Sequence, residues 1–358
     1  MNFFNKETKT AMQSIEYAQL IAHAPMVFQA TRIMRDSGIL SAIETSGVTG
    51  LTLEEVVAKV NLSHYAVRVL LESGLGIGLV IINDEKYTLT KTSYYILNDR
   101  MTNVNMNFVH DVCYKGLFHL DESLKSEKPE GLKVFGNWKT IYEALSHLPE
   151  KVQKSWFDFD HYYSDNAFPL LMPIVFKNKP TKMLDIGGNT GKWSMQYAKF
   201  DKDVAITIVD LPGQINMAKS NIEKQGLSNR IDFYEVNILD EKQNLPEGYD
   251  AIWMSQFLDC FSEKEIISIL NRCYNAITHD GIVYIVEPFW DRQRFEAAAF
   301  SLQQTSLYFT TMANGNSQMY HSDVFIKCID LAGFEVIEQI DQIGICQSLL
   351  MCKKKNIN

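Results

Sequence analysis

The residues most suggestive of chemistry lie in the segment MLDIGGNTG, residues 183–191. Asp185 ends a predicted buried strand, and a turn that opens a predicted helix follows it. Three glycines in this turn would let the backbone approach a ligand closely: Gly187, Gly188 and Gly191. Asp210 ends the next predicted strand, at the sheet edge where open α/β folds bind ligands, and its carboxylate can accept both hydroxyls of a ribose there. Together these features predict a ligand that carries a nucleoside.

Two common nucleotide-binding motifs do not fit this turn. A dinucleotide fingerprint needs GxGxxG, but counting back from Gly191 puts Ile186 where the first glycine must stand. A P-loop needs Ser or Thr after its Gly-Lys pair, and here Trp193 follows that pair. The acidic side chain before the turn suits a cationic ligand group rather than a pyrophosphate. A second glycine run, residues 74–78, follows a predicted helix, and we interpret it as a helix end that leads into a hairpin.

Strands and helices alternate from about residue 180 onward. Continuous apolar strands separated by helices are typical of a parallel sheet that is covered on both faces. The predicted strands are 183–186, 205–210, 231–236, 249–257 and 281–288, followed by a C-terminal hairpin of 334–340 and 345–352. We therefore predict an α/β fold with a doubly wound, mostly parallel sheet and a C-terminal antiparallel hairpin.

The N-terminal hundred residues are predicted to be mainly helical. Residues 11–46 form helices, Thr52 and Ser63 cap two more, and residues 78–90 form a β-hairpin, which is the order of a winged helix. Winged helices often bind DNA. However, residues 26–100 hold seven basic and eight acidic side chains, and phosphate contacts supply most DNA affinity. A dimerisation or scaffold role is therefore favoured over a DNA-binding regulator with a ligand-sensing domain.

The segment between these two regions is rich in aromatic residues. Most of them are expected in the core, and some could line a pocket for a flat apolar ligand. The chain is thus predicted to have three parts. They are a helical, winged-helix-like dimerisation domain at 1–100, connecting helices that line a ligand pocket at 101–178, and a cofactor-binding catalytic domain at 179–358.

Composition narrows the possible partners. Of 358 residues, 46% are hydrophobic and 22% charged, and the formal net charge is -9, which argues against nucleic acid or an anionic membrane as the main partner. No apolar run approaches the roughly 18–20 residues that a membrane span needs, and the N-terminus is polar without an apolar signal core. The six cysteines include no CxxC pair, which predicts reduced thiols in a cytoplasmic protein and no metal site.

From about residue 20 to 350 the chain resembles small-molecule O-methyltransferases of the caffeate and hydroxyneurosporene type. These proteins join a winged-helix-like dimerisation domain to a class I S-adenosylmethionine domain. LDIGGNTG is similar to the family's DxGGGxG loop, with Asn189 in place of one glycine, and IVDLP at 208–212 is similar to its ribose-binding strand end. The resemblance implies S-adenosylmethionine as cofactor and a homodimer. The implied cofactor contacts are Asp185, Gly187, Gly188, Gly191, Asp210, Leu211, Asn237, Ile238 and Ser255.

The segment that matches the family's catalytic residues departs from its pattern. In SQFLDCFSEKEI, residues 255–266, Asp259 stands where the family has its catalytic histidine. Ser255 stands where it has a lysine near the cofactor, and Asn237 replaces an acid at the adenine contacts. Glu287 matches the glutamate that supports the histidine, whereas the family's second glutamate falls near Ser317 and is absent.

An isolated aspartate is a poor base for a phenol, because its pKa near 3.9 lies about six units below that of a phenol. Burial and a neighbouring carboxylate both raise a carboxyl pKa. We therefore hypothesise that Asp259 and Glu287 form the catalytic pair and share a proton. The alternative is that Asp259 merely caps the helix that begins near Ser262. His161 and His321 are weaker candidates for the base.

The acceptor pocket is partly indicated by the resemblance. FDHYYSD, residues 159–165, aligns with the segment that covers the substrate, so Tyr163 and Asp165 are predicted acceptor contacts. Further predicted contacts are Met172, Phe300, Tyr308 and Met312. Such a lining suits a planar hydroxylated ring. The predicted activity is methyl transfer from S-adenosylmethionine to a hydroxyl of a small aromatic or polyketide-like molecule. The alternative is a relative that has kept the cofactor pocket and lost methyl transfer.

Overall fold

The computed structural model describes residues 3–355. Contacts divide the chain into two compact units, with the boundary between Asn107 and Phe108 in the sequence. None of the helices in residues 3–355 is long and apolar enough to cross a membrane. The first unit contains the helices α1 (Ala11–Asp36), α2 (Ile39–Ser46), α3 (Leu53–Val57), α4 (His64–Ile77), α5 (Lys91–Asn98) and α6 (Arg100–Phe108), and the hairpin β1 (Val80–Asn83) and β2 (Lys86–Leu89).

The first unit has the predicted order of helices and hairpin. Thr52 caps α3 in a capping box and the Ser63 side chain caps α4, as the sequence indicates. The prediction that the whole glycine run, residues 74–78, follows the helix is wrong, because α4 continues to Ile77 and Gly74 lies inside it. A Cβ at Gly74 would lie 2.8 Å from Cε of the buried Met34, so this glycine allows α4 to pack closely against α1. Gly78, which is left-handed, ends the helix as expected.

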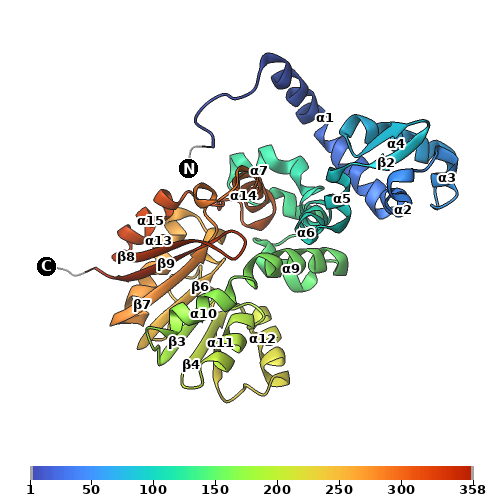
Figure 1. The fold of residues 1–358 in the computed structure, drawn as a ribbon. Coiled ribbons are helices and arrows are strands. Elements are labelled where there is room, and N and C mark those ends of the chain that lie inside the picture. The colour runs from blue at the N-terminus through green and yellow to red at the C-terminus, as the bar shows by residue number, and fades with distance from the viewer. Residues whose placement is uncertain (1–2, 356–358) are drawn as a thin grey trace. The chain divides into compact units, whose positions relative to one another are not determined.

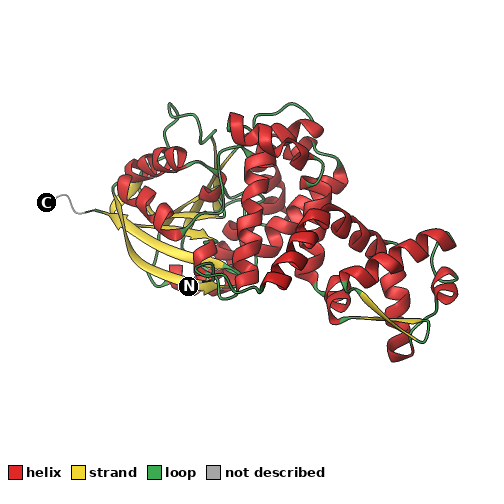
Figure 2. Cartoon of the chain, turned by 90° about the horizontal axis from the view of Figure 1, so that it is seen from above, coloured by secondary structure: helices red, strands yellow, loops and turns green. Residues whose placement is uncertain are grey.

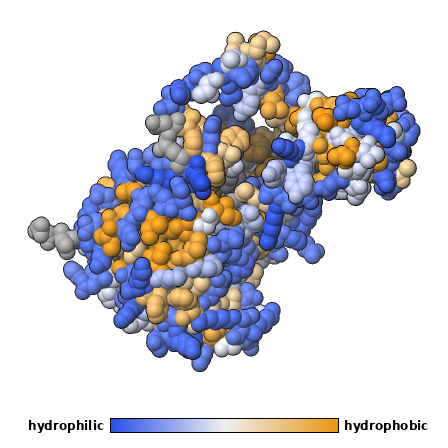
Figure 3. Space-filling view, viewed as in Figure 1, coloured by the Kyte–Doolittle hydropathy of each residue, from blue (hydrophilic) through white to orange (hydrophobic). Residues whose placement is uncertain are grey.

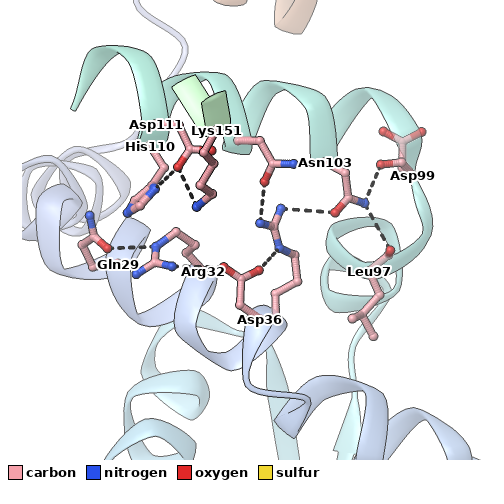
Figure 4. Close-up of polar contacts among 11 residues, drawn as sticks. Gln29, Arg32, Asp36, Leu97, Asp99, Asn103, His110, Asp111 and Lys151 are labelled. Carbon is pink, nitrogen blue, oxygen red and sulfur yellow. Dashed lines mark hydrogen bonds and ion pairs between the residues drawn. The ribbon is translucent and has the colours of Figure 1, made fainter. Parts of the chain in front are cut away.

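A partly buried arginine links α1 to α6 within the first unit (Figure 4). The Arg35 guanidinium donates to Oδ1 of Asn103 at 3.2 Å and to Oδ1 of Asn107 at 2.7 Å. Asn103 in turn donates to the carbonyl oxygens of Asp99 and Leu97 at the preceding helix end. Hydrogen bonds to charged groups are among the stronger ones, so this network fixes α6 against α1.

The second unit begins with short helical segments and ends in a seven-stranded sheet. The segments before the sheet are a π-helix η2 (Val109–Cys113), η3 (Gly116–His119), α7 (Leu120–Ser126), η4 (Glu130–Val134), α8 (Ile141–Ala144), η5 (Leu145–His147), α9 (Glu150–Ser164) and α10 (Phe168–Phe176). The strands are β3 (Lys182–Ile186), β4 (Ala205–Asp210), β5 (Ile231–Glu235), β6 (Tyr249–Ser255), β7 (Ile277–Glu287), β8 (Phe334–Ile343) and β9 (Gln347–Lys354). The intervening helical elements are α11 (Lys192–Phe200), α12 (Pro212–Lys224), η6 (Leu258–Cys260), α13 (Glu263–Ala276), η7 (Trp290–Arg292), α14 (Glu296–Tyr308), a π-helix η8 (Phe309–Ala313) and α15 (Ser322–Leu331).

The sheet confirms the predicted fold class. Its strand order is β5-β4-β3-β6-β7-β9-β8, with parallel pairing from β5 to β7 and antiparallel pairing of β9 with both β7 and β8. One apolar cluster packs α13 and α15 against the sheet, and a second packs α10, α11 and α12, so helices cover both faces (Figures 1 and 2). The carboxyl ends of β4, β3, β6 and β7 therefore lie side by side at one end of the strands, which we call the sheet edge.

The β8–β9 hairpin closes the sheet at one side. Figure 3 shows apolar side chains gathered over this hairpin, where Ile337 is 46% exposed. β8 is the edge strand, and the exposed Glu335 and Glu338 interrupt its apolar residues. Charged side chains on an edge strand oppose pairing with further strands.

We predict that Arg35→Met lowers the free energy of unfolding of the helical unit by about 1–3 kcal/mol, because two asparagine side chains lose a charged donor. Arg32→Met on the same helix is the matched control. Arg32 pairs with the half-exposed Asp36 in an i,i+4 ion pair, which is worth about 0.5 kcal/mol. Urea unfolding of the full chain followed by circular dichroism measures both, and equal losses would contradict the role given to Arg35.

Candidate active site

The turn after β3 can take only small residues at two positions. Gly187 has φ +75, and a Cβ there would lie 2.2 Å from the Phe257 ring. A Cβ at Gly188 would lie 2.8 Å from Cγ2 of Ile208. Asn189 follows with φ +50, a left-handed conformation that asparagine tolerates better than most residues. Glycine at these two positions therefore lets the turn pack against Phe257 and Ile208.

The carboxylates at the ends of β3 and β4 are fixed by hydrogen bonds. Asp210 accepts from the backbone N–H of Asn189 at 2.9 Å and of Leu211 at 2.7 Å, so β4 and the glycine turn hold each other. Burial raises the pKa of Asp210 to about 6. Asp185 is 2% exposed and accepts from the Ser194 hydroxyl. Burial raises the pKa of Asp185 to about 7, and the charge of Asp210 adds to this shift.

The loop after β5 is held by a buried arginine. Asn237 and Ile238 begin this loop, and the Asn237 side-chain oxygen accepts from the N–H of Leu239 at 3.0 Å. The Arg272 side chain, from α13, donates to the carbonyl oxygens of three loop residues: Ile238, Asp240 and Gln243. Arg272 is 8% exposed and forms no ion pair within 4 Å in residues 3–355. Most of the hydrogen bonds that Arg272 donates thus hold this loop in its conformation.

The turn after β6 carries Asp259 and is held by hydrogen bonds to Glu287 at the end of β7. One Glu287 oxygen, Oε1, accepts from the backbone N–H of Phe257 at 3.0 Å and of Leu258 at 2.8 Å. Gln256 has φ +48, so the turn is tight. Asp259 is 3% exposed, and the Cys260 thiol donates to it at 3.4 Å. The capping alternative for Asp259 does not describe this turn, because the Ser262 side chain caps α13.

Asp259 and Glu287 form a buried carboxylate pair. Burial raises the pKa of Asp259 to about 7, and the Glu287 carboxyl lies within hydrogen-bond reach of it. Burial also raises the pKa of Glu287, and the charge of Asp259 raises it further. No N–H or O–H group in residues 3–355 donates to the second Glu287 oxygen, Oε2. Two carboxyl groups in this arrangement can hold one proton between them.

A cavity of about 200 Å³ connects these elements inside the second unit. Its walls include six aromatic rings from the connecting helices and from α14 and η8: Phe108, Tyr142, Trp156, Phe159, Tyr308 and Phe309. The Trp156 indole N–H donates to the Tyr308 hydroxyl at 2.7 Å. The cavity therefore joins an aromatic wall to the polar sheet edge, and it offers room for a flat ring beside Asp259.

Most residues singled out in the sequence line this cavity. They are Asp165, Asp185, Gly187, Gly188, Asp210, Leu211, Asn237, Ile238, Ser255, Asp259 and Tyr308, together with His161. Gly191 lies just outside and begins α11 in a left-handed conformation. Glu287 lies behind Asp259 rather than on the cavity wall.

Several predicted acceptor contacts lie elsewhere. Met312 is fully buried and packs with the aromatic cluster of the connecting helices, while Met172 packs against the apolar cluster under α10. Tyr163 packs against Phe159 and Tyr162. Phe300 is 50% exposed, and His321 lies at the start of α15 near Asp291. None of these five side chains lines the cavity, so the acceptor contacts of the first four and the role of His321 as a weaker base candidate stay predictions.

Other cavity residues were not chosen from the sequence. Asp160 and Lys192 line it, and the Lys192 ammonium pairs with Asp165 at 2.7 Å. Asp160 lies inside the FDHYYSD segment. The resemblance that indicated its neighbours Tyr163 and Asp165 could therefore have indicated Asp160 as well. Five further lining side chains have a buried polar atom without a hydrogen-bond partner in the described chain: Asn189, Thr190, Trp193, Ser255 and Gln256. These unpartnered atoms are where a polar ligand would bond.

Family comparisons match both units. A model described as the Dimerisation2-like domain matches residues 16–87, and a model described as the O-methyltransferase domain matches residues 119–335. The L-tyrosine C(3)-methyltransferase of Streptomyces lavendulae is 24% identical over 301 residues, which cover 82% of this chain and 81% of that protein. The 3-hydroxy-5-methyl-1-naphthoate 3-O-methyltransferase of Streptomyces sahachiroi is 23% identical, over 72% of this chain and 75% of that protein.

Solved structures show the same fold. The S-adenosylmethionine-dependent methyltransferase SibL in its apo form aligns with a TM-score of 0.70 at 20% identity, over 95% of this chain and 99% of that one. The mitomycin 7-O-methyltransferase MmcR aligns with a TM-score of 0.71 at 13% identity, over 96% and 98%. The O-methyltransferase domain match alone spans more than half of the sequence. The chain belongs to the O-methyltransferase domain family and is an S-adenosylmethionine-dependent methyltransferase that acts on small molecules.

Proposed function

We propose that the cavity binds S-adenosylmethionine along the sheet edge and directs its methyl group to a phenolic hydroxyl beside Asp259. The single observation that carries this proposal is the buried Asp259–Glu287 pair at the wall of a cavity that also holds the glycine turn. A carboxylate with a pKa near 7 in a cavity lined by aromatic rings suits removal of a proton from a phenol.

The residues around the sheet edge fit the cofactor. A Cβ at Gly187 or Gly188 would clash with Phe257 or Ile208, so glycine lets the turn pack closely against its neighbours while both residues line the cavity. Asp210 is held by two N–H groups and keeps lone pairs for the hydroxyls of a ribose. Asn237 and Ile238 border the cavity where an adenine would lie, and the Asn237 side chain retains its amide N–H groups as donors. Asp185 would face the ammonium end.

When bound, the cofactor supplies a methyl group on a sulfonium for in-line transfer to the acceptor oxygen. The protein holds the two ligands in line, which accounts for most of what such an enzyme must supply. Asp259, which is ionised while Glu287 keeps the proton that the pair shares, takes the proton of the acceptor hydroxyl. Glu287 also holds the turn through Phe257 and Leu258, so the base stays in place during transfer.

The aromatic wall supports a small, flat acceptor. Tyr308 already accepts from the Trp156 indole, which leaves this part of the wall with mainly ring surface to offer. Phe108 and Phe159 are stacked at 4.0 Å between ring centroids, and Phe108 meets Tyr308 edge to face. A phenol or naphthol ring can pack against such a wall with its hydroxyl toward Asp259.

Transfer to a ring carbon is a second candidate, because the relative from Streptomyces lavendulae is named as an L-tyrosine C(3)-methyltransferase. Loss of the phenolic proton also activates the carbon next to the hydroxyl, so the same base would serve. The two candidates differ only in which acceptor atom faces the methyl group.

We also propose a homodimer through the first unit. The Dimerisation2-like match covers most of that unit, and α1 exposes a series of large apolar side chains: Met12, Ile15, Leu20, Ile21 and Met26. All six cysteines lie in the described chain and are free thiols, which supports a cytoplasmic setting. The acidic balance of residues 26–100 supports the absence of a nucleic-acid partner.

Product analysis tests the proposed activity. The full chain is incubated with S-adenosylmethionine and a panel of phenols that includes L-tyrosine, and the products are identified by mass spectrometry and NMR. We expect S-adenosylhomocysteine together with an aryl methyl ether. A new aryl C–CH₃ signal would establish the second candidate instead. Binding of S-adenosylmethionine without any methylated product across the panel would contradict both.

Asp259→Asn is expected to lower kcat by about 10²–10⁴-fold, because the acceptor loses its base. In the unaltered enzyme the rate should rise with pH up to about 7 and then level, since only the ionised Asp259 accepts a proton and its pKa is about 7. The variant should lose that dependence. Glu263→Gln, an exposed acid on the first turn of α13, is the control. A near-unaltered rate in Asp259→Asn would remove Asp259 as the base.

Arg272→Lys is expected to weaken binding of S-adenosylhomocysteine about tenfold, because the loop that carries Asn237 and Ile238 loses its multidentate clamp. Arg230→Lys is matched in chemistry, since Arg230 donates to the carbonyl oxygens of Asp201 and Val204 away from the cavity. Calorimetric titration should show an unchanged dissociation constant for Arg230→Lys. Equal weakening in both variants would mean that the effect is general loss of stability.

A further inference from the structure

Asp160 is a cavity carboxylate that the proposed methyl transfer does not use. It lies on α9, next to Phe159 and one helical turn after Trp156, and both of those rings belong to the cavity wall. Its carboxylate is near enough to Asp259 for the two charges to act on each other. Asp160 therefore lies on the acceptor side of the cavity, within reach of a ligand that touches Asp259.

No lysine or arginine in residues 3–355 forms an ion pair with Asp160, although the charge of Lys192 acts on Asp160 and lowers its pKa. Lys192 lines the cavity, but its ammonium pairs with Asp165 at 2.7 Å. His161 lies 3.7 Å from Asp160, and burial, followed by the charge of Lys192, lowers the pKa of His161 to about 4. The imidazole is thus neutral at pH 7. The Asn189 amide donates to Asp160 at 3.3 Å, which is a long and weak hydrogen bond.

A second observation points to a donor on the ligand. The other side-chain atom of Asn189, Oδ1, is buried and has no hydrogen-bond partner among the described residues. It belongs to the same side chain that contacts Asp160, so a carboxylate and an unpartnered amide oxygen lie next to each other on the cavity wall. A group with more than one N–H donor would satisfy both oxygens.

We propose that Asp160, with Asn189 Oδ1, binds a protonated amine on the methyl acceptor, so that the acceptors of this enzyme are phenols that carry a basic nitrogen. This inference rests on the proposed function, since it uses Asp259 as the point that the phenol oxygen reaches. An acceptor with a carboxylate in place of the amine would meet Asp160 and Asp259 with like charge and would bind weakly.

The cofactor is a less suitable partner for Asp160. The cavity already offers Asp185 and Asp210 at the strand ends, where the glycine turn places the cofactor. Asp160 comes instead from the helix that supplies the aromatic wall. Burial raises the pKa of Asp160 to about 7. The charges of Asp165 and Asp259 add to this shift, and Lys192 and Asn189 reduce it. A cationic acceptor would relieve this repulsion.

The test uses three phenols of similar shape and different charge. Tyramine is a cation, N-acetyltyramine is neutral, and 3-(4-hydroxyphenyl)propanoate is an anion. Each is titrated calorimetrically at pH 8 into the full chain saturated with S-adenosylhomocysteine. We expect tyramine to bind at least about tenfold more tightly than the other two, which corresponds to about 1.4 kcal/mol.

Asp160→Asn should remove that preference, whereas Asp158→Asn should keep it. Asp158 is the matched control, because it carries the same charge on the same helix and pairs with Lys154 on the exposed side. Both variants should bind S-adenosylmethionine and S-adenosylhomocysteine within about threefold of the unaltered chain. The tyramine preference should shrink at pH 6, since Asp160 binds a proton there and no longer attracts the ammonium.

Three results would overturn the inference. The first is equal affinity for the three phenols, or no binding of any. The second is a preference that survives in Asp160→Asn. The third is weaker binding of S-adenosylhomocysteine by Asp160→Asn, which would assign this carboxylate to the cofactor. Failure of the proposed function is distinguishable, because it would appear as absent cofactor binding or absent methylated product in the unaltered chain.

Discussion

The parallel register of β4, β3, β6 and β7 is the constraint on which the rest of the site depends. Because these strands pair in parallel, their carboxyl ends meet at one edge, and the turns that follow them face a common cavity. Asp210, Asp185 and Asp259 are far apart in sequence and come together there. Helices on both faces bury the strands, so the edge is rigid and its polar groups are already in place before a ligand binds.

The same arrangement concentrates buried carboxyl groups around one cavity. Burial raises the pKa of Asp185, Asp210, Asp160 and Asp259, which means that each carboxylate would gain from a cation. Backbone N–H groups partly offset the rise in pKa at Asp210 and at Glu287, because hydrogen bonds to a carboxylate favour its charged form. The protein thus uses turn geometry, rather than basic side chains, to hold acids at the sheet edge, and a cationic cofactor completes the balance of charge.

The parts of the site that could be predicted are those set by local sequence. The glycine turn needs left-handed backbone at Gly187, and Asp210 follows from the end of an apolar strand, so both are visible without a fold. The end of α4 was harder to predict, because the reason for a glycine inside this helix, its close contact with Met34 of α1, cannot be read from the local sequence. For the same reason, the sequence did not indicate Asp160 or the hydrogen bonds from Arg272 to the loop after β5. Their meaning depends on Asn189 and on the loop at Ile238, which lie far away in the chain.

In the mechanism that we propose, Asp259 takes the place of the histidine that the sequence resemblance implies, and the base is tuned in a different way. An imidazole has a pKa near 6.5 without help, whereas a carboxylate must be raised from about 3.9 to work in the same range. Deep burial provides that shift here, and Glu287, whose pKa burial also raises, holds the proton that the pair shares. A buried pair of acids would repel if both were ionised, so the turn must be held firmly. The two hydrogen bonds from the backbone N–H groups of Phe257 and Leu258 to Glu287 provide this restraint, so Glu287 supports the turn although it does not reach the cavity.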